Sequence, residues 1–137
     1  MSNISGVYVH ERDEGVEEFY EQRGAHFLAE KMMVKMSPTV TIKVDDEGTY
    51  RLHTKTQVKN FEWIFKLGQE VSLPTPDGTR TFIFEVDENG KLTQTPTGES
   101  ASMGVQIERE FSDDGMVMTL MHLASGESAK RHFRRSQ

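Results

Sequence analysis

The stretch that decides the fold runs from Lys59 to Glu70 and reads Lys-Asn-Phe-Glu-Trp-Ile-Phe-Lys-Leu-Gly-Gln-Glu. Its large apolar side chains recur at every second position, which is the period of a β-strand with two unlike faces. One face carries Phe61, Trp63, Phe65 and Leu67, and the other carries Glu62, Ile64 and Lys66. Gly68 ends the alternation, so we predict an amphipathic strand that stops at a turn.

The same two-residue period continues on both sides of this stretch, from Thr39 to the C-terminus. Val40 and Ile42 form one face of an expected strand, and the pair Asn89-Gly90 is a strong hairpin signal. Further turns are predicted at 46–48, 74–78, 96–98, 113–115 and 125–126. Many short strands at this spacing predict an antiparallel sandwich or barrel.

The segment before the strands, from about Asp13 to Met36, has a helical pattern instead. Its apolar residues recur at three- and four-residue spacing, as in the set Val16, Phe19, Tyr20 and Phe27. Asp13 is predicted to cap the first helix, because a carboxylate there can accept hydrogen bonds from free backbone amides.

Gly24 divides this helical segment into two short predicted helices, Gly15–Arg23 and Ala25–Lys35. Pro38 then prevents further helix. A helical pair followed by a long series of strands fits a barrel with a helical lid.

Composition excludes several classes of function. A chain of 137 residues forms one domain, residues 1–137, and the absence of cysteine excludes disulfides and thiolate chemistry. The net charge of −6 gives no reason to expect nucleic-acid binding. No apolar run approaches the roughly 20 residues that span a bilayer, and no signal segment is recognisable, so we expect a cytoplasmic protein.

Arg109 is the main chemical clue in the sequence. It shares a strand face with Val105, Ile107 and Phe111, whereas the opposite face is polar. A guanidinium keeps its proton, so burying it requires a partner. A ligand carboxylate, an internal Asp or Glu, or water at a strand end would each serve, and the pattern leaves all three open.

Arg131 is a second candidate, because it shares its face with Ala129 and Phe133. Its basic neighbourhood also fits a solvated edge strand. The five histidines have no metal-ligand spacing, and we expect most of them on strand surfaces or in the lid.

These features together resemble the intracellular fatty-acid-binding protein family over nearly the whole chain. The stretch from Lys59 is similar to that family's Phe-Lys-Asn-Thr-Glu-x-x-Phe-x-Leu-Gly-x-Glu run, and Gly6-Val7-Tyr8 is similar to its opening Gly-x-Trp. Glu108-Arg109-Glu110-Phe111 and Arg131-His132-Phe133 lie where the family carries its two ligand arginines. His10 stands where the family usually has an aliphatic residue.

The resemblance implies an all-β fold, namely a ten-stranded antiparallel up-and-down β-barrel (a clam) capped by a helix-turn-helix lid at about residues 15–36. It implies a non-enzymatic monomer that binds and transports long-chain fatty acids or similar hydrophobic carboxylates, with no cofactor, no metal and no nucleic acid. A retinoid or other isoprenoid acid is an alternative ligand. A second alternative is a barrel scaffold that meets a membrane or a partner, with transient membrane contact through the lid.

The resemblance also assigns site residues. It gives the ligand carboxylate to Arg109 and Arg131. The pocket and portal are expected to comprise Val16, Phe19, Tyr20, Phe27, Pro38, Val58, Asp77, Met118, Leu120 and Phe133. The family has a tyrosine where this chain has Phe133, so one hydrogen bond to the head group, worth about 0.5–1.5 kcal/mol, is expected to be missing.

Overall fold

The computed structural model describes residues 3–22, 37–57, 59–75, 78–98, 101 and 104–136. The first two elements are strand β1 (Gly6–Glu14) and helix α1 (Val16–Gln22). Nine further strands follow: β2 (Thr39–Val44), β3 (Thr49–Lys55), β4 (Asn60–Lys66), β5 (Val71–Thr75), β6 (Gly78–Val86), β7 (Leu92–Pro96), β8 (Val105–Phe111), β9 (Gly115–His122) and β10 (Ser128–Ser136).

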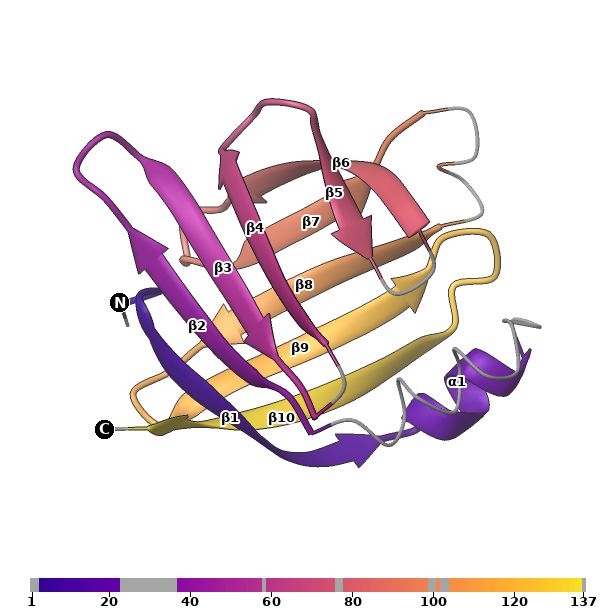
Figure 1. Ribbon diagram of the computed structural model, residues 1–137. Coiled ribbons are helices and arrows are strands. Elements are labelled where there is room, and N and C mark those ends of the chain that lie inside the picture. The colour runs from indigo at the N-terminus through magenta and orange to yellow at the C-terminus, as the bar shows by residue number, and fades with distance from the viewer. Residues whose placement is uncertain are drawn as a thin grey trace.

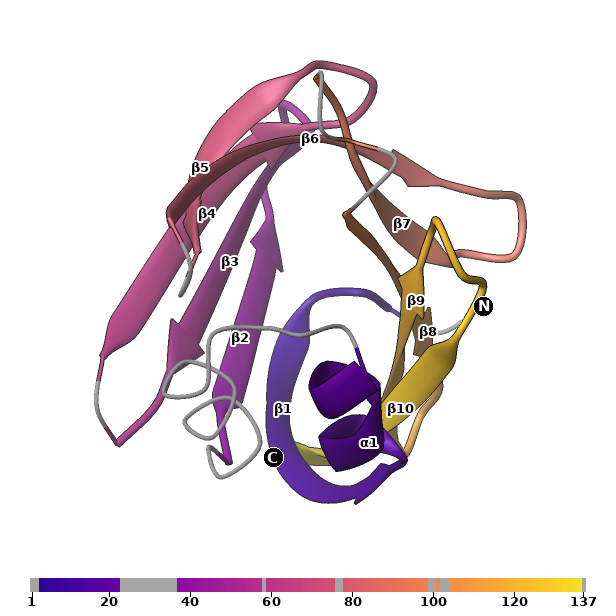
Figure 2. The same ribbon diagram turned by 90° about the vertical axis from the view of Figure 1, so that its right-hand side faces the viewer.

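The ten strands form one antiparallel sheet in the order β4-β3-β2-β1-β10-β9-β8-β7-β6-β5. The sheet curls into a nearly closed barrel with α1 at one end, as Figures 1 and 2 show. This confirms the predicted ten-stranded clam with a helical cap. The second predicted helix, Ala25–Lys35, lies outside the described residues.

The stretch that decides the fold forms β4 largely as its alternation predicts. Phe65 faces the interior and is buried, whereas Ile64 on the opposite face is 43% exposed. The prediction was wrong for Leu67, which lies in the turn after β4 and is exposed. Gly68 adopts a positive φ of 75°, and its amide donates to the Phe84 carbonyl at 2.8 Å, so the chain has already left the β4 ladder at Leu67.

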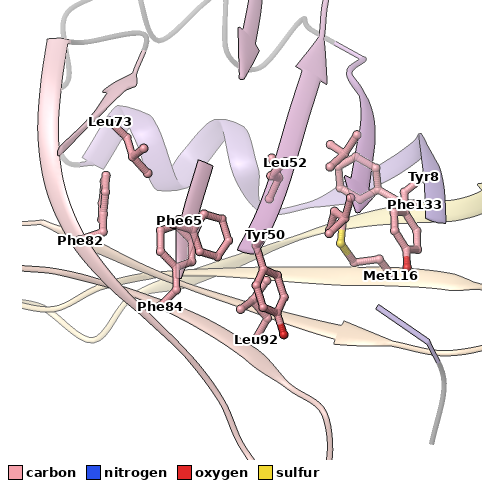
Figure 3. Packing of buried hydrophobic residues seen from close by; sticks show 12 residues of the cluster. Tyr8, Tyr50, Leu52, Phe65, Leu73, Phe82, Phe84, Leu92, Met116 and Phe133 are labelled. Atoms are coloured by element: carbon pink, nitrogen blue, oxygen red, sulfur yellow. The ribbon is translucent and has the colours of Figure 1, made fainter. Parts of the chain in front are cut away.

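The barrel has one seam, between the edge strands β4 and β5, which are not neighbours in the hydrogen-bonded sheet. Aromatic side chains close it from inside. Phe65 of β4 stacks on Phe84 of β6 with ring centroids 3.6 Å apart and 13° between the ring planes (Figure 3). The Trp63 indole nitrogen donates to the Pro74 carbonyl across the seam at 2.7 Å.

Figure 1 shows both chain ends at the end of the barrel away from α1. Arg135, near the C-terminal end of β10, holds several segments together there. Its guanidinium donates to the carbonyls of Asn3, Ser5 and Ser112 at 2.8–3.0 Å. It also lies over the Tyr8 ring, 4.9 Å from the centroid. One side chain therefore joins the N-terminal segment, β1, β10 and the β8–β9 turn.

Strand β1 extends further than the sequence predicts, and this changes the role of Asp13. β1 continues through Glu14, Gly15 turns the chain with a φ of 69°, and the helix begins at Val16. Asp13 is therefore a strand residue, and the prediction that it caps the helix was wrong.

A β-bulge in β1 decides where the Asp13 side chain lies. The register with β10 shifts between His10 and Arg12, which leaves Glu11 as the extra residue. Tyr8 and His10 pack inward before the bulge, and Asp13 meets the buried Arg131 after it. The inward positions thus change from even to odd numbers within β1.

Candidate functional site

Four side chains from β8, β9, β10 and β1 lie in one line across the sheet. Arg109 is opposite Met118, Met118 is opposite Arg131, and Arg131 is opposite Asp13. We call these four residues the arginine row. Neighbouring strands are about 4.8 Å apart, so the Cα atoms of the two arginines are about 10 Å apart. Both arginines are buried, with 4% of Arg109 and 7% of Arg131 exposed.

Arg109 is a buried cation with a neutral partner. Its Nη1 donates to the amide oxygen of Gln94, itself buried, at 3.0 Å. No carboxylate of the described residues lies within ion-pair distance of its guanidinium. Burial lowers the pKa of Arg109 to about 10, because the interior disfavours the charged form. A carboxylate placed here would find a cation that no acidic side chain of the described residues compensates.

Arg131, in contrast, has an internal carboxylate. Its Nε donates to Asp13 Oδ1 at 2.9 Å, and its Nη2 lies 3.5 Å from Asp13 Oδ2. This is the internal ion pair, one of the alternatives that the sequence left open for a buried arginine. The two arginines of the row therefore differ in the charge of their partners.

His10 completes the polar group around Asp13. Its Nε2 lies 2.6 Å from Asp13 Oδ1, and two acceptors would repel at that distance, so Nε2 carries a proton and donates it. Its Nδ1 lies 3.2 Å from the Ser37 hydroxyl, and its ring meets Phe133 edge-on with centroids 5.5 Å apart. With a side chain only 8% exposed, His10 departs from the surface position expected of most histidines.

The apolar residues of the predicted pocket lie on both sides of the arginine row. Val16, Phe19 and Tyr20 form the buried face of α1 and pack with Leu120 and Ala129 of β9 and β10. Phe133 belongs to the larger cluster inside the barrel, where Figure 3 shows it with Tyr8 and Met116. Met118 packs against both clusters.

Of the four remaining predicted site residues, the structure describes Pro38. Pro38 is buried, and its carbonyl accepts a hydrogen bond from the His10 amide at 3.1 Å, so it lies beside the polar group. Phe27, Val58 and Asp77 lie outside the described residues.

A pocket of about 350 Å³ lies between α1 and the β9–β10 turn, lined by Gly15, Glu18, Phe19, Glu127 and Ser128. It lies beside the helix, and none of its lining residues belongs to the arginine row. In the described part of the chain, no group of three or more His, Cys, Asp or Glu side chains could hold a metal ion. None of its helices is long and apolar enough to cross a membrane.

No family model matches the sequence. A fatty-acid-binding protein of Tyrophagus putrescentiae is 31% identical over 137 residues, which cover 98% of this chain and 99% of that protein. The chain belongs to the fatty-acid-binding protein family. A solved fatty-acid-binding protein from brain tissue of Drosophila melanogaster is 30% identical and has a TM-score of 0.81, over 97% of this chain and 99% of that one. A Schistosoma mansoni fatty-acid-binding protein, solved in complex with arachidonic acid, shares the fold at a TM-score of 0.87 and 24% identity, over 100% of this chain and 98% of that one.

In this fatty-acid-binding protein, the sequence indicated the two arginines of the row but not their partners, Gln94 and Asp13. Gln94 was detectable in principle, because it shares strand parity with the buried Leu92 and is the polar residue on that face. Asp13 had no such signal, because its partner is 118 positions away and the bulge reverses its parity.

Proposed function

We propose that this protein binds and transports long-chain fatty acids or similar hydrophobic carboxylates inside its barrel, as a cytoplasmic monomer that makes and breaks no covalent bond. The observation that carries the proposal is the buried Arg109 cation, whose partner in the described structure is the neutral amide of Gln94. Membership in the fatty-acid-binding protein family supports the same ligand class. The head-group site comprises the arginine row, with Arg109 and Arg131 as its two cations.

The two ends of such a ligand contribute in different ways. The alkyl chain contributes affinity, at about 0.8 kcal/mol for each methylene removed from water. The carboxylate contributes orientation, because a guanidinium can donate two parallel hydrogen bonds to it. Met118 lies between the two arginines, and its flexible thioether suits contact with a chain of changing shape.

Entry of the ligand is proposed at the α1 end of the barrel. The helix is held there by one face, through Val16, Phe19 and Tyr20, and the pocket beside it is open to this end. The ligand would pass when this face moves away from Leu120 and Ala129. Transient membrane contact through this end is part of the proposal, and the exposed Glu17 and Glu18 disfavour a strongly anionic surface.

Calorimetric titration of delipidated protein tests this function. We expect palmitate to bind with a stoichiometry of one, and methyl palmitate to bind more weakly because it carries no charge. Shortening the acid by four methylenes should weaken binding by about 3 kcal/mol, or roughly 200-fold.

Two results of that titration would contradict the proposal. Equal affinities for acid and ester would remove the role of the buried cations, and absence of binding by every acid would remove the ligand class. Retinoic acid serves as the comparison ligand, and tighter binding of it than of palmitate would favour the isoprenoid-acid alternative.

A further inference from the structure

The two arginines of the row are alike in burial and orientation and differ in the charge of their partners. Arg109 donates to an amide oxygen, that of Gln94, whereas Arg131 donates to the carboxylate of Asp13. We propose that Asp13 is a resident counterion that occupies Arg131 and so directs the ligand's carboxylate to Arg109. The inference rests on the proposed function and names the residue that selects between its two cations.

The charges in the row support this selection. Arg109, Arg131 and Asp13 together leave one positive charge among the described side chains of the row. A single carboxylate at Arg109 would neutralise it. A carboxylate at Arg131 would instead lie against Asp13, and two like charges in contact in a buried site repel strongly.

The position of Asp13 is set by three features of the fold. The bulge at Glu11 brings the Asp13 side chain to Arg131, and the β1–β10 register sets the two residues opposite each other. His10 then donates to the same carboxylate oxygen that Arg131 Nε contacts, at 2.6 Å. Because both His10 and Arg131 donate to the Asp13 carboxylate, a ligand carboxylate that displaced it would have to break both contacts.

Exchanging the amide and the carboxylate between the two sites tests the inference, because each exchange changes charge and hardly changes shape. Gln94→Glu gives Arg109 an internal carboxylate, Asp13→Asn gives Arg131 a neutral partner, and the double variant has the net charge of the wild-type protein. Glu14→Gln is the matched control, since Glu14 is next to Asp13 on β1 but is exposed and pairs with His132 on the outside. Palmitate and methyl palmitate are titrated into each protein, and a thermal melt confirms folding.

We expect Gln94→Glu to weaken palmitate binding at least about tenfold, because the new carboxylate repels that of the ligand. Adding Asp13→Asn should restore binding to within about threefold of wild type, because Arg131 then binds the ligand's carboxylate in place of Arg109. Methyl palmitate and the Glu14→Gln protein should show changes below about threefold. Binding by the folded double variant that stays as weak as in Gln94→Glu would overturn the inference, as would full affinity in Gln94→Glu itself.

Two further outcomes distinguish a failure of this inference from misfolding of the double variant and from a failure of the proposed function. If the double variant does not fold, Asp13→Asn alone decides: we expect about tenfold tighter palmitate binding from the additional positive charge roughly 10 Å from the ligand carboxylate, and unchanged affinity would overturn the inference. If the wild-type protein and Glu14→Gln bind no palmitate, the proposed function itself fails. Wild-type binding with no restoration by Asp13→Asn removes only the role of Asp13.

Discussion

Replacing Arg109 by methionine is expected to weaken the binding of palmitate by about 100-fold and to leave the binding of methyl palmitate nearly unchanged. Two hydrogen bonds to a charged carboxylate, together worth roughly 2.7 kcal/mol, are lost for the acid only. Methionine keeps an unbranched apolar side chain of similar length, so the change removes the charge with little loss of packing. Calorimetric titration with both ligands measures the difference.

The same substitution should raise or preserve the thermal stability of the ligand-free protein. Burial without a carboxylate lowers the pKa of Arg109 to about 10, because the interior disfavours the charged form. Removing this buried charge is expected to offset the hydrogen bond that the buried Gln94 amide loses. A residue retained for structure would behave in the opposite way, with lower stability and equal losses for acid and ester. Arg134→Met is the control, because Arg134 is exposed on the outer face of β10 and its loss should change neither affinity by more than about twofold.

Replacing Phe84 by alanine is expected to lower the free energy of unfolding by about 4 kcal/mol. Phe84 is fully buried, stacks on Phe65 and contacts Trp63 and Phe82. These rings close the seam between β4 and β5, where the sheet has no ladder of backbone hydrogen bonds. The loss would be a large part of the 5–15 kcal/mol that typically separates a folded domain from its unfolded state. Chemical denaturation measures it.

Ile64→Ala is the matched control for the seam. Ile64 also lies in β4 and also loses a large apolar side chain, but it points outward and is 43% exposed. We expect it to cost less than about 1 kcal/mol. Similar losses for the two variants would mean that the inner aromatic rings contribute no more to the barrel than a surface residue does.

The alternation of apolar residues predicted much of the fold because it reflects burial directly. In β4 the sequence placed Trp63 and Phe65 on one face and Ile64 on the other, and the structure shows that the face of Phe65 is the inner one. Val16, Phe19 and Tyr20 of α1 were likewise recognised from their spacing, since one face of a helix must meet the core. Arg109 was found in the same way, as a charge on an apolar face.

Which residue meets which arginine could not be predicted, because that depends on the long-range register of the strands. Asp13 precedes a run of acidic residues and therefore resembles a helix cap, and only the pairing of β1 with β10 shows that the strand continues past it. The bulge at Glu11 then reverses the parity that periodicity arguments rely on. Gln94 faces Arg109 for a similar reason, because its position follows from how β7 pairs with β8.

A crystal structure of the protein with bound palmitate tests the central claim most directly, namely that a fatty acid lies inside the barrel with its carboxylate on Arg109. The account predicts the alkyl chain within the barrel, the carboxylate within about 3 Å of the Arg109 guanidinium, and the Asp13–Arg131 ion pair intact. A palmitate bound outside the barrel would contradict the account. So would a carboxylate seated on Arg131 with Asp13 displaced from it.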